Sequence, residues 1–422
     1  MDNIFTVAAY GQMISDVVRM DSYTRALKHA VNPGTVVVDI GTGTGIFALL
    51  ACRLGARRVY AIEPDDAIQV AREIAVSSGC GDRIEFIQAM STDVTLPERA
   101  NVIISDLGGA LPWFEQHIAS IVDARRRFLA PDGVLIPRRD AAWAAVVEVE
   151  DVYAERLGPW ENTRFGLDME PARRIMVNTF ARARVTQENL LTDLRRWTIL
   201  DYAVVEDPDV CAQVSWRVVR AGTGHGLALG LDRTVADGIC FSNAPDATHA
   251  MRATVYPTLL FPWPAPVALE PGDVVTVDIE ARLIRREYIW SWKTQVWAGG
   301  DVNRQKTHFS QSTFFGVPLS PATLQKNAAS SAPTLNEDGR IARRVLESMS
   351  DGVSLEEIAR RLTAEFSTRF ARRYDALCHT VELSRQYGET SSTSVTGPLS
   401  AGFEQTSTPI LDGDSVVRRD GD

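Results

Sequence analysis

Short apolar runs and longer amphipathic segments alternate along residues 35–137. The runs VVVDI, RVYAIE, RIEFIQ, NVIISD and GVLIP have the length and composition of buried strands, and the segments 45–55, 65–79 and 113–130 have helical spacing. Strands that alternate with helices predict a parallel sheet with helices on both faces. Residues 1–33 are predicted to form helices that precede this sheet.

The pattern changes after Pro137. The segments AAWAAVVEVE, TILDYAVVE, DVVTVDIEARLI and YIWSWKTQVWA, separated by turn residues, predict an antiparallel sandwich or barrel. Later, RIARRVLESM, SLEEIARRLTAEF and RYDALCHTVELSRQY predict a small helical, winged-helix-like domain, and the Ser/Thr/Gly/Pro-rich end predicts a disordered tail. The chain is thus predicted to be an α/β protein with the parts 1–33, 34–139, 140–317, 335–388 and the tail 389–422.

Composition narrows the class of protein. With 422 residues, 45% hydrophobic and 23% charged, the chain has the balance of an ordinary globular protein of several domains. Its net charge of −10 argues against a nucleic-acid partner, because the phosphate backbone is also negatively charged. Five scattered cysteines without a CxxC pair predict a reduced, cytoplasmic protein without a metal site. The sequence has no apolar run of the kind found in signal peptides or membrane spans, so we expect neither.

A glycine-rich turn carries the first chemical signal. Asp39 ends the first predicted strand, Gly41, Gly43 and Gly45 follow at every second position, and Glu63 ends the next strand. Such a loop brings bare backbone against a ligand, and the carboxylate can accept hydrogen bonds from both ribose hydroxyls of a nucleoside. The alternative is a tight strand–helix turn without a ligand, in which Asp39 only closes a strand.

The sequence of this turn, DIGTGTG, is similar to that of the class I S-adenosylmethionine (SAM)-dependent methyltransferases, whereas dinucleotide-binding folds usually have GxGxxG. The resemblance implies a Rossmann-like domain, SAM as cofactor, and the glycines, Asp39 and Glu63 as cofactor-binding residues.

From about residue 10 to 317 the chain resembles the protein arginine methyltransferases in particular. The segment MISDVVRMDSY resembles the family's D-x-x-R helix, which implies that Arg19 holds the cofactor carboxylate. The segment MSTD lies where the family contacts the adenine, which implies a role for Ser91 and Thr92. An ordinary surface position of Arg19 on its helix is the alternative.

Catalytic residues follow from the same resemblance. ISDLGGALPWFEQ resembles the family's hairpin in which two carboxylates, nine residues apart, clamp the substrate guanidinium, which maps them to Asp106 and Glu115. Two such carboxylates can orient a nitrogen nucleophile and help to disperse its proton. FSNAPDATHAMRATVY resembles the segment of the T-H-W loop, which implies that His249 pairs with Asp16. Residues 159–169 resemble the start of the family's dimerisation arm, which implies a homodimer.

Several departures from the family predict a changed acceptor. Asp106 is one methylene shorter than the family's glutamate, His117 stands where the family has a methionine, and the tyrosine-rich motif is missing from residues 3–7. Ala250 replaces the tryptophan of the T-H-W loop. A shorter acid suits a bulkier or differently seated nucleophile, such as a terminal amine. We therefore place His117 in the substrate pocket, with a position on the helix surface as the alternative. Both an amine and a guanidine remain as acceptors.

The segment 340–388 resembles the small PqqD-type domains, which recognise leader segments of ribosomally made peptide natural products. A leader peptide bound there would raise the effective concentration of its substrate end at the catalytic site. A helical domain for self-association is the alternative.

The sequence thus predicts a SAM-dependent N-methyltransferase for an amine or guanidine of a peptide, in peptide natural-product biosynthesis, with the daptide-type methyltransferases as one concrete case. The alternatives are a methyltransferase for protein arginine, for free arginine or for a related metabolite, and a non-catalytic scaffold that retains the fold.

Overall fold

The computed structural model describes residues 6–161, 166–245, 251–252, 255–301 and 303–388. The chain divides into two compact units, Met1–Leu319 and Ser320–Asp422.

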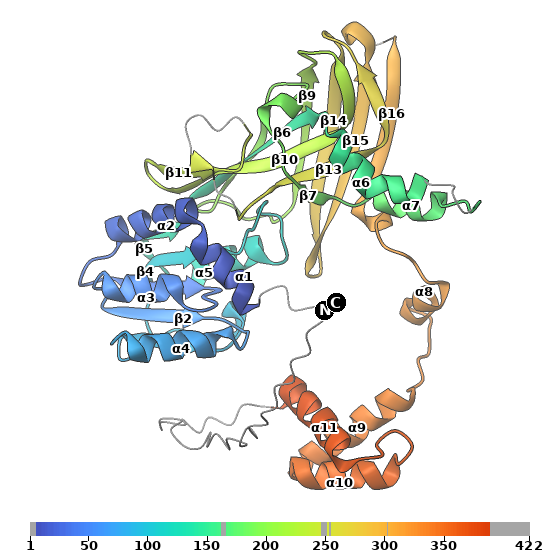
Figure 1. Ribbon diagram of the computed structural model, residues 1–422. Helices are drawn as coiled ribbons and strands as arrows, with labels where there is room; N and C mark the ends of the chain where they lie inside the picture. Colours follow the sequence, from blue (N-terminus) through green and yellow to red (C-terminus); the bar gives the residue numbers. More distant parts are fainter. Residues whose placement is uncertain (1–5, 162–165, 246–250, 253–254, 302, 389–422) are drawn as a thin grey trace, which may run out of the picture. The chain divides into compact units, whose positions relative to one another are not determined.

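A parallel sheet forms the first half of the larger unit (Figure 1), in the strand order β3-β2-β1-β4-β5. Since β1 pairs with both β2 and β4, the strand order reverses beside β1, and the carboxyl end of β1 is the place where ligands bind in sheets of this type. The strands are β1 (Val36–Ile40), β2 (Arg58–Ile62), β3 (Ile84–Ile87), β4 (Ala100–Ser105) and β5 (Leu129–Ile136).

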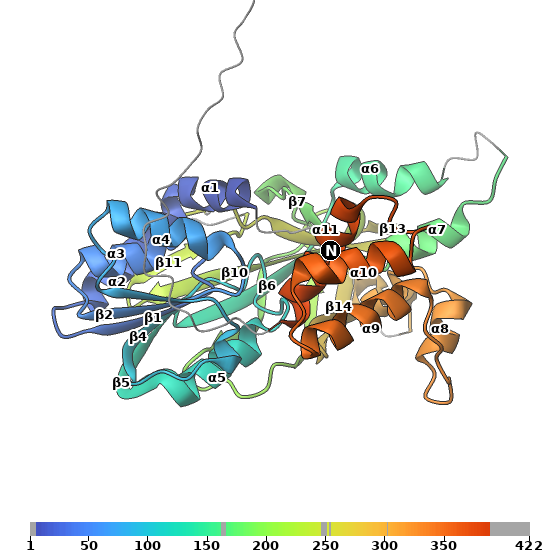
Figure 2. The same cartoon turned by 90° about the horizontal axis from the view of Figure 1, so that it is seen from below.

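Helices cover both faces of this sheet, as the alternating pattern predicts. Val37 packs with α2 and α3, whereas Val36 and Val38 belong to the core on the opposite face, which includes α5. Figure 2 shows α3 and α4 on one side of the strands and α5 on the other. The helices are α1 (Val7–Ser15), α2 (Val17–Ala30), α3 (Ile46–Arg53), α4 (Ala67–Ser77) and α5 (His117–Phe128), with a 3-10 turn η1 (Ser91–Asp93) after β3.

An antiparallel β-structure follows, as predicted for residues 140–317. It consists of a seven-stranded and a four-stranded sheet, the latter in the order β16-β15-β14-β9, and the short β12 pairs with β11 in parallel. Its strands are β6 (Arg139–Val147), β7 (Ala181–Ala183), β8 (Arg195–Asp201), β9 (Val210–Arg217), β10 (Gly222–Ala236), β11 (Ile239–Ser242), β12 (Met251–Arg252), β13 (Thr258–Leu269), β14 (Val274–Ile284), β15 (Glu287–Trp297) and β16 (Gln305–Ser312).

Two helices between β6 and β7 were not predicted. They are α6 (Glu150–Glu161) and α7 (Glu170–Met176). Helix α6 buries only Tyr153 and Leu157, and α7 buries no residue, so the sequence carries almost no periodic apolar signal for them. The short 3-10 turns η2 (Gln187–Asn189), η3 (Ala298–Gly300) and η4 (Thr313–Phe315) complete this half.

The parallel sheet and the β-structure share their cores, and this places residues of both halves around one site. Tyr23 and Leu27 of α2 pack in one cluster with Phe241 and Tyr256 of the β-structure. The rings of Tyr23 and Phe241 lie 6.3 Å apart.

The smaller unit is helical. Helices α9, α10 and α11 pack around an apolar core that includes Ile341, Val345, Ile358 and Leu362. The prediction of helices is therefore confirmed, but residues 320–388 contain no strand, so a wing is absent from this described range. The predicted tail 389–422 lies outside the described residues. The helices are α8 (Pro321–Asn327), α9 (Glu337–Ser350), α10 (Leu355–Glu365) and α11 (Arg373–Tyr387).

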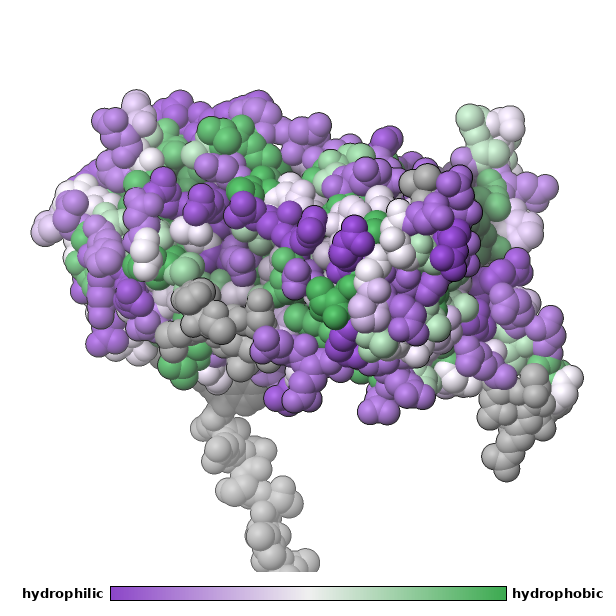
Figure 3. Space-filling model, turned by 90° about the horizontal axis from the view of Figure 1, so that it is seen from above, coloured by the Kyte–Doolittle hydropathy of each residue, from purple (hydrophilic) through white to green (hydrophobic). Residues whose placement is uncertain are grey.

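Within the described part of the chain, every helix is too short or too polar to cross a membrane. On the face that Figure 3 shows, hydrophilic side chains are spread among smaller hydrophobic patches.

Candidate cofactor and acceptor site

The glycine-rich loop lies at the carboxyl end of β1. Gly41, Gly43 and Gly45 have φ values of 71°, 54° and 84°, in the left-handed region that glycine adopts at little cost. A Cβ atom on Gly41 would come within 2.3 Å of Leu107, and one on Gly43 within 2.3 Å of the Tyr10 ring. Both the backbone conformation and the close approach of Leu107 and Tyr10 therefore require glycine at these positions.

Glu63 lies next to this loop, at the end of β2, and is buried. Its Oε2 accepts a hydrogen bond from the Gly43 N–H at 2.9 Å, and Oε1 accepts one from the Asp65 N–H at 3.0 Å. A carboxylate has about four acceptor positions, so about two remain for ribose hydroxyls. Burial raises the pKa of Glu63, and a cationic ligand nearby would offset part of that cost.

Asp39 has a local structural role in this structure. Its Oδ2 accepts hydrogen bonds from the Thr42 hydroxyl at 2.5 Å and from the Ala48 N–H at 3.0 Å, so it fixes the turn into α3. Burial raises the pKa of Asp39 to about 7, although these hydrogen bonds act in the opposite direction. A direct contact of Asp39 with a cofactor stays a prediction.

Arg19 is buried and is not a surface arginine of its helix. Asp16 caps α2 by accepting a hydrogen bond from the Arg19 N–H at 3.1 Å, which fixes the first turn that carries this side chain. The guanidinium lies 5.0 Å from the centre of the Phe47 ring, in the first turn after the glycine loop. It therefore lies near the start of α3, and its contact with the carboxylate of a cofactor stays a prediction.

Asp106, directly after β4, is the most highly bonded acid of the site. Its Oδ2 accepts hydrogen bonds from Arg19 Nε at 2.6 Å and from the Tyr256 hydroxyl. Its Oδ1 accepts from the Tyr23 hydroxyl at 2.9 Å and from Arg233 Nη1 at 2.7 Å. Burial alone would raise the pKa of Asp106, but Arg19 and Arg233 hold it below its usual range.

Glu115 differs from Asp106 in its surroundings, because it is exposed. Its φ of 44° lies in the left-handed region, which is uncommon for a residue other than glycine. The structure thus places one predicted clamp acid in a saturated buried cluster and the other at the surface. Their joint role as a clamp stays a prediction.

The other predicted residues have different outcomes. The side chain of Asp16 is buried and also accepts a hydrogen bond from the Val255 N–H at 2.9 Å, but His249 lies outside the described residues, so their pairing stays a prediction.

Ser91 is buried and Thr92 is exposed, both in η1. Because Glu63 N–H donates to the Ile87 carbonyl at the end of β3, η1 begins near the same edge of the sheet as Glu63.

The side chain of His117 is buried, close to Gly108 of the loop that follows Asp106, and it lines a small cavity together with Tyr202. Its role in a substrate pocket stays a prediction. The Tyr202 hydroxyl donates to Asp140 Oδ2 at 2.7 Å, so the 2.9 Å contact of Tyr202 with His117 requires Nε2–H of the imidazole as donor. A Cβ atom on Gly108 would come within 3.1 Å of His117 Nε2, which explains the glycine there.

The buried imidazole gives a pH-dependent term in stability. Burial, and then Arg233, lower the pKa of His117 from 6.5 to about 4. The unfolded chain therefore binds a proton that the folded chain does not, and stability falls as the pH drops from 6.5 towards 4. The unmodified chain should therefore lose about 2 kcal/mol more unfolding free energy between pH 7 and pH 5 than the His117→Gln variant does. Urea unfolding at both pH values measures this, and an equal loss in both proteins would contradict it.

Sequence reasoning missed Arg233 and Asp140, which complete this cluster. Arg233 donates from Nε to Asp140 Oδ1 and from Nη2 to Asp140 Oδ2, both at 2.8 Å. The signal was present in β10, where Leu227, Leu229, Leu231 and Val235 occupy every second position and face a core, with Arg233 in the same series. A charge on the inward face of an alternating strand indicates a buried ionic partner.

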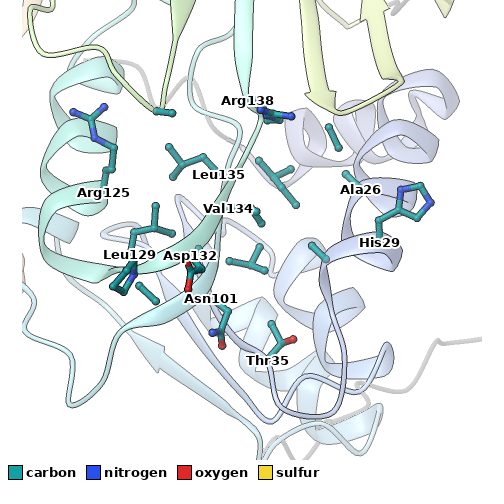
Figure 4. A pocket seen from close by; sticks show the side chains of 18 of the residues that line it. Ala26, His29, Thr35, Asn101, Arg125, Leu129, Asp132, Val134, Leu135 and Arg138 are labelled. Atoms are coloured by element: carbon teal, nitrogen blue, oxygen red, sulfur yellow. The ribbon is translucent and has the colours of Figure 1, made fainter.

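A large cavity lies elsewhere. Figure 4 shows its lining, which includes Thr35 before β1, Asn101 at the start of β4 and Val134 of β5. These positions lie at the amino end of β1 and β4, whereas the glycine loop follows their carboxyl end. The cavity is therefore separate from the candidate site.

Comparisons with known proteins agree with this architecture. The family model of ribosomal protein L11 methyltransferase (PrmA) matches residues 23–140. The chain is 30% identical to the probable protein arginine N-methyltransferase 6 of Arabidopsis thaliana over 54% of either chain. It is 41% identical to protein arginine N-methyltransferase PRMT10 of Oryza sativa subsp. japonica, over 32% of this chain and 36% of the relative. The chain thus spans about half, or less, of the length of these relatives.

Solved structures extend the likeness beyond the parallel sheet. Protein arginine methyltransferase 10 of Arabidopsis thaliana, in an open conformation, aligns with a TM-score of 0.64 and 22% identity over 73% of this chain and 98% of that one. The enzyme–prozyme heterotetrameric complex of Trypanosoma brucei PRMT1 with AdoHcy aligns with a TM-score of 0.64 and 21% identity, over 72% of this chain and 96% of that one. Over almost three quarters of its length, the chain therefore has the fold of the protein arginine methyltransferases.

Proposed function

We propose that the protein is a SAM-dependent methyltransferase that methylates a nitrogen atom of a peptide or protein. The observation that carries the proposal is the arrangement at the carboxyl end of β1: a glycine loop that requires bare backbone, Glu63 with acceptor positions to spare, and Arg19 beside the same loop. The arginine methyltransferases among the similar proteins support the same chemistry.

These residues suit the parts of SAM. Glu63 would accept hydrogen bonds from the ribose hydroxyls, the Gly41–Gly45 backbone would lie against the amino-acid end, and Arg19 would hold its carboxylate. When bound, SAM supplies an electrophilic methyl group, and the new N–C bond forms as the S–C bond breaks and the nitrogen loses a proton. Catalysis by this chain is then mainly positioning of the acceptor nitrogen. Glu115, exposed at the surface, would receive the acceptor and accept its proton directly or through water.

Methyl transfer to synthetic peptides tests the proposal. The full-length chain is incubated with isotopically labelled SAM and peptides that offer an arginine, a lysine or a free amino terminus, and the products are analysed by mass spectrometry. We expect mass increases of one or two labelled methyl groups on nitrogen. SAM consumption only with free arginine or other small molecules would contradict the peptide or protein acceptor, and no turnover despite cofactor binding would favour a scaffold.

The helical unit supplies a second prediction. We propose that α9–α11 bind a segment of the peptide substrate, such as a leader, as the resemblance of residues 340–388 implies. Removal of residues 320–422 should then raise the KM for the full-length peptide about tenfold or more, with kcat nearly unchanged, because the lost tethering lowers the effective concentration. The cut lies at the boundary between the two compact units. Unchanged steady-state kinetics would contradict this role and favour self-association.

We also propose a homodimer, with α6 and α7 as the dimerisation arm. The support is the resemblance of residues 159–169 to the family's arm and the multimeric state of the Trypanosoma brucei complex. Light scattering coupled to size-exclusion chromatography measures the mass, and a monomer at micromolar concentration would contradict the proposal.

A further inference from the structure

Arg233 brings a second cation of the protein to Asp106. It is fully buried, it lies on β10 of the antiparallel structure, and its three nitrogen atoms donate to Asp106 and Asp140. Together with Arg19, the cluster contains two arginines and two aspartates, so its charges balance without a substrate.

All acceptor positions of Asp106 are in use. Its two oxygens receive four donors in total, from Arg19, Arg233, Tyr23 and Tyr256. A carboxylate offers about four lone-pair positions, and a substrate guanidinium binds best through two parallel hydrogen bonds to both oxygens. Even if Arg19 turned towards the carboxylate of the cofactor, Oδ1 would keep Tyr23 and Arg233. Asp106 therefore has no room for a bidentate guanidinium.

The charge of the buried cluster also disfavours a substrate guanidinium. A guanidinium stays protonated at all physiological pH values, so a substrate arginine would add a third buried cation beside Arg19 and Arg233. A primary amine can enter as the neutral base, because its ordinary pKa lies near 8 at a peptide amino terminus and near 10.4 on a lysine. The neutral form is also the form with the lone pair that attacks the methyl group.

We infer that Arg233, held by Asp140, determines the acceptor class by occupying Asp106, so that the site takes the primary amine of a peptide and excludes the guanidinium of arginine. The inference rests on the proposed function and narrows its acceptor. In the reaction the neutral amine nitrogen forms the N–C bond while the S–C bond of SAM breaks, and the resulting ammonium loses its proton to Glu115 or water.

Three peptides of otherwise equal sequence test this inference on the full-length protein. One has a blocked amino terminus and an arginine, one a blocked terminus and a lysine, and one a free terminus with neither residue. We expect kcat/KM for the better amine peptide to exceed that for the arginine peptide by about a hundredfold or more, and the two amine peptides distinguish an α-amine from a lysine. A higher kcat/KM for the arginine peptide would overturn the inference.

A charge-balanced variant tests the role of Arg233 itself. Arg233→Met combined with Asp140→Asn removes one cation and one anion and leaves Asp106 with a free acceptor position. In a folded variant that still binds S-adenosylhomocysteine, the amine-to-arginine ratio of kcat/KM should fall about tenfold or more, through a gain on the arginine peptide. An unchanged ratio would overturn the inference. If this variant fails to fold, the ratio measured on the unmodified protein decides.

A matched control and a separate outcome complete the design. Arg220 and Glu148 form a 2.7 Å ion pair elsewhere in the β-structure, so Arg220→Met with Glu148→Gln should leave the ratio unchanged. If none of the peptides is methylated, the result contradicts the proposed function as a whole. The selection by Arg233 is measured separately, as a ratio of kcat/KM values between active substrates.

Discussion

Asp106→Asn should abolish methyl transfer and also destabilise the folded chain. The substitution removes a buried negative charge between Arg19 and Arg233 and places an amide N–H₂ among four hydrogen-bond donors. Removal of one partner from a buried ion pair costs about 3 to 5 kcal/mol of unfolding free energy. We expect a clear drop in melting temperature and a loss of turnover of roughly a thousandfold or more, because the same cluster positions Arg19 for the cofactor.

Glu115→Gln is the matched control for this prediction. Glu115 is exposed, so the substitution should change the unfolding free energy by less than about 0.5 kcal/mol. It should nevertheless lower kcat/KM about a hundredfold, because it removes the acid that we propose receives the acceptor. Thermal unfolding and steady-state kinetics on both variants separate the two roles. A stable Asp106→Asn variant, or a fully active Glu115→Gln variant, would contradict the assignment concerned.

Gly43→Ala should reduce cofactor binding. The residue has a φ of 54°, and its new Cβ atom would lie 2.3 Å from Cε1 of Tyr10. The left-handed conformation alone costs an L-residue roughly 1 to 2 kcal/mol, and the collision forces the loop or α1 to move. We expect the dissociation constant for S-adenosylhomocysteine to rise by about tenfold or more.

Gly79→Ala separates backbone strain from the collision. Gly79 has a similar φ of 67°, and no atom lies within 4 Å of the position of a Cβ atom there. This variant should lose some stability but bind S-adenosylhomocysteine as tightly as the unmodified chain. Equal affinities of the Gly43→Ala variant and the unmodified chain would show that the loop does not hold the ligand.

The sequence predicted the parallel sheet and its ligand loop because both have strong local signals. Alternating buried runs define the strands, and glycines with positive φ at every second position define the turn into α3. Helices α6 and α7 carried no such signal, because they bury two residues and none, respectively. The helices predicted before the sheet are α1 and α2, and α2 begins where Asp16 caps it.

The acceptor site was predictable only in part. The resemblance to the family's two-carboxylate hairpin singled out Asp106 and Glu115, but the burial of Asp106 depends on contacts with distant parts of the chain. Arg233 lies 127 positions from Asp106, and no local pattern connects the two. The contact of His117 with Tyr202 of the β-structure also joins residues far apart in the sequence, and no local pattern predicted it.

Calorimetric titration of S-adenosylhomocysteine into the full-length chain tests the central claim most directly. The claim is that the Gly41–Gly45 backbone, Glu63 and Arg19 form a SAM site. The prediction is heat of binding with one site per chain and a dissociation constant on the order of micromolar, lost or strongly weakened by Glu63→Ala. No heat with the well-folded chain, or equal binding by the Glu63→Ala variant, would contradict it.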